Sequence, residues 1–221
     1  TLDVSHAVGL KTLNVAGNKL VSFNVAQNKA LTSLNVNDND LVSLDVTKLL
    51  SLTELSCGGN EISLLNLSKN TALTSLDCHG NKLTSLDLAK NTALTTLDCG
   101  ENAIATIYLG TEKLVSLDCA NNSLTSINVA LQTKLAEFDC SHNKLEQLDV
   151  TNCTKLATLY CSSNNLAMLN ISNNSMLTTL DCSNNASLAK LWVKDDAQQG
   201  AVAITKDNTT TTYFNNGGIV I

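Results

Sequence analysis

LTSLDCHGNKLTSLDLAKNTA, residues 73–93, is the unit that the rest of the chain repeats. The following residues, 94–113, read LTTLDCGENAIATIYLGTEK, and the preceding ones, 52–72, read LTELSCGGNEISLLNLSKNTA. Self-similarity at a period of 20 to 50 residues is typical of repeat architectures, in which each unit is one supersecondary element. Because the unit recurs almost from end to end, the sequence predicts one elongated stack of repeats.

We use the word coil for one copy of this unit and align the coils on their first leucine. The nine coils begin at Leu10, Leu31, Leu52, Leu73, Leu94, Leu114, Leu135, Leu156 and Leu177. Every step is 21 residues except the step from Leu94 to Leu114, which is 20, and the missing residue falls in the loop of residues 109–113. Each coil contains two LxxLxL segments, which we call the first and the second segment. Alternation within LxL buries every second side chain, so the segments are predicted to be short strands. One coil cannot bury its apolar side alone, and stacked coils share a continuous core.

A cysteine recurs at one core position of the first segment. The cysteines of this column are Cys57, Cys78, Cys99, Cys119, Cys140, Cys161 and Cys182. Valine fills the same position at Val15 and Val36. Parallel side chains in neighbouring strands give poor disulfide geometry, and an odd number of cysteines cannot pair completely. Cysteine also behaves as a small buried hydrophobe, so we predict a packed ladder of thiols. Cys153 lies outside this column, and we predict that it is the one reachable thiol.

An asparagine follows each first segment without exception. These asparagines are Asn18, Asn39, Asn60, Asn81, Asn102, Asn122, Asn143, Asn164 and Asn185. Asparagine in a turn bonds to nearby backbone groups, and stacked asparagines also reach the adjacent coil. We therefore interpret this column as structural.

The pattern LxxLxCxxNxL is the core signature of leucine-rich repeats, over about residues 2–193. The short unit with its two nested segments resembles the bacterial IRREKO-type subclass, and the cysteine column resembles internalin J-like repeats. This resemblance implies a right-handed solenoid with parallel β-sheets and irregular or short helical turns. It also implies a non-enzymatic binding module at a bacterial cell surface or in the extracellular space, anchored through lipid or cell wall by segments outside this chain.

The ends depart from the pattern. Residues 1–4 match a second segment, so we expect the solenoid to begin within a coil and to lack an N-terminal cap. Residues 1–193 form the predicted solenoid, and residues 194–221 form a predicted C-terminal cap. Within the cap, residues 201–204 and 219–221 are expected to be strands, with Trp192 at the junction.

Composition excludes several functions. The formal net charge of −6 argues against a nucleic-acid partner, which would require clustered Lys and Arg. No apolar run approaches the ~20 residues needed to cross a bilayer. No catalytic triad order, phosphate-binding loop or zinc-type CxxC pattern is present. We therefore predict no enzyme, no cofactor and no metal site.

The candidate binding residues point outward from the first segments. They are Asp77, Asp98, Asp118, Asp139, Tyr160 and Asp181, flanked by Glu137. The aspartates could bind a basic protein patch, a cation or sugar hydroxyls, but the repeat encodes them, and we favour a structural origin. Departures from the repeat are better candidates for a specific site. These are Glu54, His79, Glu137 and Tyr160 on the first face, and Tyr108, Met168 and Trp192 on the second. Tyrosine is enriched at binding hot spots, so the preferred patch is Tyr160 with Glu137, Asp139 and Asp181.

Three functional hypotheses follow. The first is an adhesion or recognition module that binds a protein or a glycan through one sheet face. The alternative is a structural spacer or assembly subunit of a larger surface complex. A third, a threonine lattice for ice or mineral, rests on Thr32, Thr53, Thr74 and Thr95, and is disfavoured because the column fails at Val115, Ala136 and Ala157.

Overall fold

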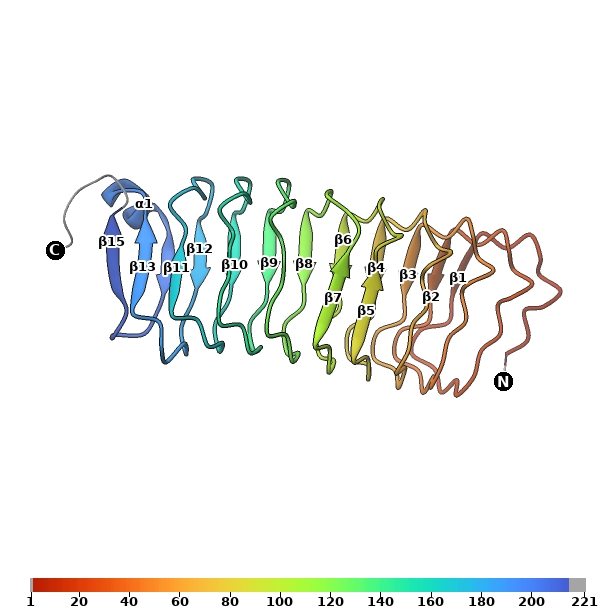
Figure 1. Cartoon of the computed structure of the whole chain (residues 1–221). Coiled ribbons are helices and arrows are strands. Elements are labelled where there is room, and N and C mark those ends of the chain that lie inside the picture. The colour runs from red at the N-terminus through yellow and green to blue at the C-terminus, as the bar shows by residue number, and fades with distance from the viewer. Residues whose placement is uncertain (1, 215–221) are drawn as a thin grey trace. The chain divides into compact units, whose positions relative to one another are not determined.

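The structure, a computed structural model, describes residues 2–214 of the 221-residue chain. The chain divides into two compact units between Thr111 and Glu112. This boundary falls in the loop where one repeat is a residue shorter than the others. Figure 1 shows short strands following one another in both units, joined by tight loops.

The first unit contains two parallel sheets. Its larger sheet has the order β1 (Thr12–Asn14), β2 (Ser33–Asn35), β3 (Glu54–Ser56), β4 (Ser75–Asp77) and β6 (Thr96–Asp98). Each of these strands comes from a first segment and pairs in register with the same positions one coil away, as Leu55 does with Leu76. The other sheet pairs β5 (Ser85–Leu88) with β7 (Thr106–Leu109), both from second segments.

The second unit repeats this plan. Its larger sheet has the order β8 (Ser116–Asp118), β9 (Glu137–Asp139), β10 (Thr158–Tyr160), β12 (Thr179–Asp181) and β14 (Ala203–Thr205). A three-stranded parallel sheet joins β11 (Met168–Asn170), β13 (Lys190–Val193) and β15 (Thr211–Phe214). The single helix of the described residues is α1 (Asp196–Ala201). The predicted solenoid of parallel strands is confirmed. Only some second segments are strands, although the others bury the same leucine positions.

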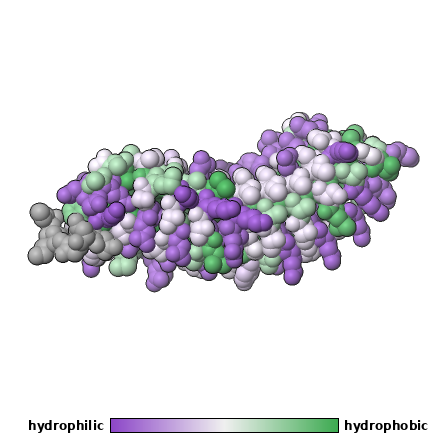
Figure 2. All heavy atoms as spheres, turned by 90° about the horizontal axis from the view of Figure 1, so that it is seen from above, coloured by the Kyte–Doolittle hydropathy of each residue, from purple (hydrophilic) through white to green (hydrophobic). Residues whose placement is uncertain are grey.

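The core consists of leucine rows that run along each stack. Leu73, Leu76, Leu83, Leu86 and Leu88, all from one coil, are at most 1% exposed. Outward positions carry small polar or charged residues, and Figure 2 shows polar side chains over much of the visible surface with apolar ones scattered among them. No helix among the described residues has the length and apolar character of a membrane span.

Most members of the asparagine column join their coil to the preceding one. The side-chain amide of Asn102 donates to three backbone carbonyls, those of Cys99 and Gly100 in its own loop and that of Cys78 one coil back, at 3.0–3.2 Å. Its Oδ1 accepts from the backbone amide of Leu83 at 3.0 Å. Asn60, Asn143 and Asn164 make the same bonds at their own positions. The geometry therefore agrees with the structural interpretation of this column.

The cysteine column is a ladder of buried thiols. None of the eight cysteines, all of which lie within the described residues, forms a disulfide, and each is 0% exposed. Burial raises the pKa of the Cys182 thiol to about 12, because a thiolate loses its hydration inside the core. The predicted packed ladder agrees with this arrangement.

The prediction for Cys153 is wrong. Its side chain is fully buried, and its Sγ donates to the carbonyl of Val129 at 3.6 Å. Cys153 occupies a second asparagine column, in the turn after each second segment, where Asn91 and Asn174 are also fully buried. The Asn174 amide bonds to the carbonyls of Val150 and Cys153, so this turn folds inward against the adjacent coil. The sequence position looked like an exposed turn, but stacking covers it.

The C-terminal segment continues both sheets of its unit. Strand β14 pairs with β12, and β15 pairs with β13. Trp192 stacks on Tyr213 with ring centroids 5.0 Å apart, which places it at the junction with β15. The side chain of Gln198 in α1 donates to the carbonyls of Ile171 and Asn174, replacing the turn asparagine of earlier coils. The expected strand at 201–204 corresponds to β14, and residues 219–221 lie outside the described residues. The role of residues 194–221 as a cap stays a prediction.

Candidate binding surfaces

The first-segment face of the second unit contains the preferred patch. Tyr160 on β10 is in register with Asp139 on one side and Asp181 on the other. Because alternate residues of a strand point to one face, these three side chains leave the same side of the sheet. Tyr160 is 40% exposed, so its ring is available to a ligand.

A shallow pocket of about 360 Å³ lies beside Tyr160. Its lining is Ser116, Leu117, Asp118, Glu137, Phe138, Asp139, Thr158 and Tyr160. The structure therefore brings together four of the predicted residues, Asp118, Glu137, Asp139 and Tyr160. Asp181 is not in this lining, although it is a register partner of Tyr160.

The aspartates of the patch already have structural roles. One carboxylate oxygen of Asp139 accepts from the backbone amide of Ser141 at 2.9 Å and from its hydroxyl at 2.6 Å. Asp181 makes the same pair of bonds with Ser183, and Asp118 accepts from the amide of Ala120. Each aspartate thus closes the turn that follows its strand. This hydrogen bond to the turn explains why the repeat encodes an aspartate at this position. It agrees with the structural origin favoured from the sequence.

Glu137 and Tyr160 are not explained by that turn. Glu137 is exposed on β9, where Ser116 Oγ donates to its Oε2 at 3.4 Å. The residue between Glu137 and Asp139 is Phe138, which is 1% exposed and replaces a leucine in the core. The patch therefore offers an aromatic ring with a hydroxyl, flanked by carboxylates. Such a set can stack on a sugar ring, accept sugar hydroxyls, or contact a cationic side chain.

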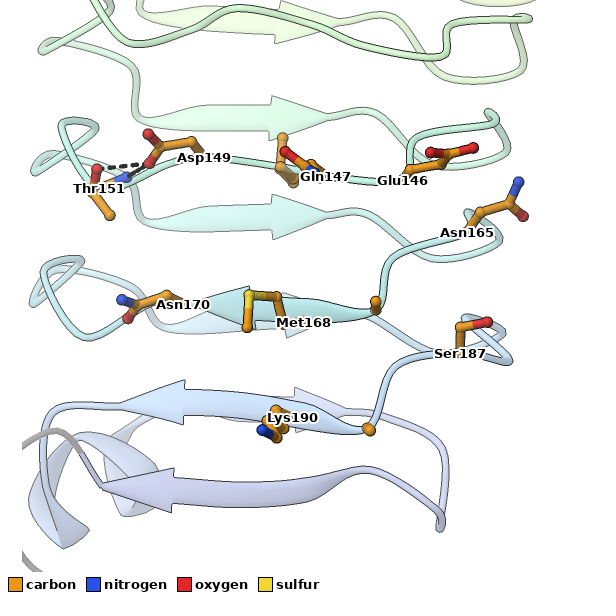
Figure 3. A pocket seen from close by; sticks show the side chains of 12 residues that line it. Glu146, Gln147, Asp149, Thr151, Asn165, Met168, Asn170, Ser187 and Lys190 are labelled. Carbon is orange, nitrogen blue, oxygen red and sulfur yellow. Dashed lines mark hydrogen bonds between the residues drawn. The ribbon is translucent and has the colours of Figure 1, made fainter.

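A larger groove lies on the second-segment side of the same unit. Its volume is about 1100 Å³, and it is open to solvent along the coils. Its lining is Glu146, Gln147, Leu148, Asp149, Thr151, Asn165, Ala167, Met168, Asn170, Ser187, Ala189 and Lys190. Figure 3 shows Met168 on β11 and Lys190 on β13 at its centre, with Asp149 and Thr151 joined by hydrogen bonds at one end.

The sequence interpretation missed this groove, although two signals pointed to it. Met168 departs from the repeat and is 55% exposed, and the second segment of the ninth coil begins at Leu188, one residue later than the repeat predicts. An extra residue between two segments alters how neighbouring second segments lie relative to each other. Leucine periodicity alone does not reveal this change.

The remaining predicted residues, Asp77 and Asp98, belong to the first unit. They are register partners on β4 and β6. His79, one of the departures from the repeat on the first face, joins them: its Nδ1 lies 2.6 Å from Asp77 Oδ1. The sequence predicted no metal site, yet ligand atoms of Asp77, His79 and Asp98 lie within 4.8 Å of one another.

The threonine column does not offer a free hydroxyl lattice. Thr53, Thr74 and Thr95 each donate their hydroxyl to a backbone carbonyl one coil back, at 2.9–3.1 Å. Hydroxyls held by the sheet are poor donors to a mineral or ice surface.

Comparison with solved structures identifies the class of protein. A domain of InlJ from Listeria monocytogenes, described as including a cysteine ladder, matches with 34% identity and a TM-score of 0.83. The match covers 98% of this chain and 56% of that one, so the chain spans little more than half of the InlJ domain. No family model and no curated protein matches the chain.

Two receptor structures share the fold. One is the leucine-rich repeat ectodomain of a membrane receptor kinase from Arabidopsis thaliana, in complex with Casparian strip integrity factor 2, at 20% identity and a TM-score of 0.76. It covers 99% of this chain and 29% of that one. The other is TLR13 in complex with ssRNA13, at 22% identity and a TM-score of 0.65, covering 94% and 38%.

The stacked parallel strands, the 21-residue period and these neighbours define the class: the chain is a leucine-rich repeat protein. Within that class its cysteine ladder is similar to that of InlJ.

Proposed function

We propose that the chain is a non-catalytic recognition module of a bacterial surface or secreted protein, and that it binds a protein or glycan ligand around Tyr160. The observation that carries the proposal is the pocket beside Tyr160, where residues that depart from the repeat line the same hollow as repeat-encoded aspartates. The similarity to InlJ supports the surface location. The acidic balance of the chain favours a neutral glycan or a basic protein segment as the ligand, and disfavours nucleic acid.

Tyr160 is the residue on which to test the proposal. It contributes a half-exposed aromatic ring that no repeat position requires, so Tyr160→Ala removes binding surface without opening the core. We expect a glycan array, and a panel of Lys- and Arg-rich peptides, to yield a ligand for the parent chain. Hot-spot aromatics contribute about 2 kcal/mol or more, so Tyr160→Ala should weaken that ligand by roughly 30-fold or more.

Tyr108→Phe and Tyr108→Ala are matched controls on β7 of the other unit. Tyr108 is 60% exposed, so the change in exposed aromatic area is comparable. Unchanged affinity of Tyr160→Ala, with the fold verified by circular dichroism, would contradict the proposal. Absence of any ligand, combined with concentration-dependent self-association, would support the spacer or assembly alternative.

A further inference from the structure

The cluster on the first unit joins residues from two strands and one turn. Asp77 ends β4, Asp98 ends β6, and His79 follows Asp77 in the turn. Asp77 and Asp98 face each other in register, so their carboxylates leave the same face of the sheet. The ring of His79 turns back toward Asp77, and one ligand atom from each of the three residues lies within 4.8 Å of the others. All three side chains are half-buried.

A glycine in the preceding coil leaves room for the imidazole. A Cβ placed on Gly58 would lie 2.3 Å from His79 Nδ1 and 2.9 Å from Asp77 Oδ1. The glycines with positive φ are Gly17, Gly59 and Gly80, and Gly58 is not among them. The backbone therefore does not explain this glycine, whereas the space needed by the ring does. On the other side of His79, the residue at the same position of the next coil is Gly100, which also has no side chain.

Asn37, two coils before His79, orients the carboxylate of Asp77. Its side-chain Nδ2 donates to Asp77 Oδ2 at 2.8 Å, and its side-chain Oδ1 accepts from the backbone amide of Gly58 at 2.7 Å. The other oxygen of Asp77, Oδ1, is left facing the His79 ring at 2.6 Å. Hydrogen-bonded partners of this kind hold metal ligands in place in known metal sites.

The charges of the cluster favour a cation. One oxygen of Asp77 and one of Asp98 lie within 4.8 Å of each other. Carboxylates crowded in a half-buried place repel each other, and a bound dication relieves that repulsion.

We propose that Asp77, His79 and Asp98 bind a divalent transition-metal ion of the Zn²⁺ class, with Asn37 as a positioning residue and Gly58 as the opening for the ring. An imidazole nitrogen with two carboxylates suits Zn²⁺, Co²⁺ or Mn²⁺, whereas Ca²⁺ takes six to eight oxygens and Mg²⁺ keeps most of its waters. Three protein ligands leave coordination positions for water or for a side chain of a partner. The proposal does not depend on binding at Tyr160.

Isothermal titration of the whole chain with ZnCl₂ tests the proposal, in a phosphine-reduced buffer at neutral pH, with CaCl₂ titrated separately. We expect one Zn²⁺ site and no comparable Ca²⁺ site. Loss of a ligand should cost at least as much as loss of an orienting residue, which is about 10- to 100-fold in affinity. His79→Ala and Asp98→Asn should therefore weaken Zn²⁺ binding at least about tenfold.

His142→Asn is the matched control, because His142 is exposed in the equivalent turn of a coil in the other unit. Asparagine tolerates the positive φ of 53° at that position. This variant should bind Zn²⁺ as the parent does. Gly58→Ala gives a second test, since its methyl group displaces the ring and should weaken Zn²⁺ binding while the backbone at residue 58 accepts alanine.

Equal Zn²⁺ affinity of the parent chain and His79→Ala would overturn the proposal, because it would assign the binding to thiols or scattered carboxylates. Absence of any one-site Zn²⁺ binding by the parent would also overturn it. Weakened binding in His79→Ala, Asp98→Asn and Gly58→Ala, with His142→Asn unchanged, would establish the site.

Discussion

Single residues repeated in every coil contribute much of the hydrogen bonding between coils. Asn102 makes four bonds, two of them to the preceding coil. Asn18, in the first described coil, donates to Val15 and Ala16 of its own loop and is exposed. The same residue type thus has two different environments within one chain.

We predict that Asn102→Ala lowers the free energy of unfolding by about 1–3 kcal/mol, because its buried backbone partners lose their bonds. Asn18→Ala should lower it by less. Urea denaturation followed by circular dichroism measures both changes, and equal stabilities of Asn102→Ala and the parent would contradict the structural role.

Buried thiols make the stability depend on alkaline pH. Burial raises the pKa of Cys153 to about 11 and that of Cys182 to about 12, from an ordinary value of 9.0. The unfolded chain can ionise its thiols at a lower pH than the folded chain. The contribution of these groups to stability is therefore complete below pH 9.0 and is lost as pH rises through the raised values.

We expect none of the eight thiols to react with a thiol reagent in the native protein at neutral pH, and all eight to react after unfolding. The midpoint of urea denaturation should fall as pH rises above about 9. A single fast-reacting thiol in the native chain, mapped to Cys153 by mass spectrometry, would show that this turn is open in solution.

At the scale of one element, the loop after each first-segment strand contains a left-handed residue. Glycine occupies it at Gly17, Gly59 and Gly80, and other residues at Asp38, Glu101, Asn121, His142, Ser163 and Asn184, with φ between 53° and 68°. A non-glycine residue is strained there by roughly 1–2 kcal/mol, and asparagine and aspartate by less. The sequence shows this only as a preference for small polar residues before the column asparagine.

Ser163→Gly should raise the free energy of unfolding by up to about 1 kcal/mol, because relief of the strain exceeds the entropy that glycine loses on folding. Gly80→Ser should lower it by a similar amount. The melting temperatures of the two variants should therefore shift in opposite directions from that of the parent. A shift of both in the same direction would contradict the strain assigned to this left-handed position.

At the scale of the whole molecule, repetition separates two kinds of residue. A residue that recurs in every coil, such as Asp139 or Asn102, is explained by a bond that also recurs. A residue that departs from the repeat, such as Tyr160, His79 or Met168, has no such explanation, and each of these lies at a pocket, cluster or groove. Candidate sites in this chain are therefore found by looking for residues that depart from the repeat.

The amino-acid sequence is sufficient to predict the period, the buried leucine rows, the cysteine ladder and the asparagine column, because each depends on neighbours at a nearly constant spacing of 21 residues. It also indicated Tyr160 with Glu137 and Asp139, since adjacent strands in register bring these positions together. Local alternation and stacking are sufficient for such predictions.

The side-chain contacts between different coils could not be predicted from the sequence and are seen in the folded structure. Cys153 is buried because its turn folds against the coil before it. His79 joins Asp77 and Asp98 because Gly58 leaves space for its ring, and the groove at Met168 borders the coil that has an extra residue before Leu188. These features depend on rotamers and on contacts between residues of different coils, which a periodic pattern does not specify.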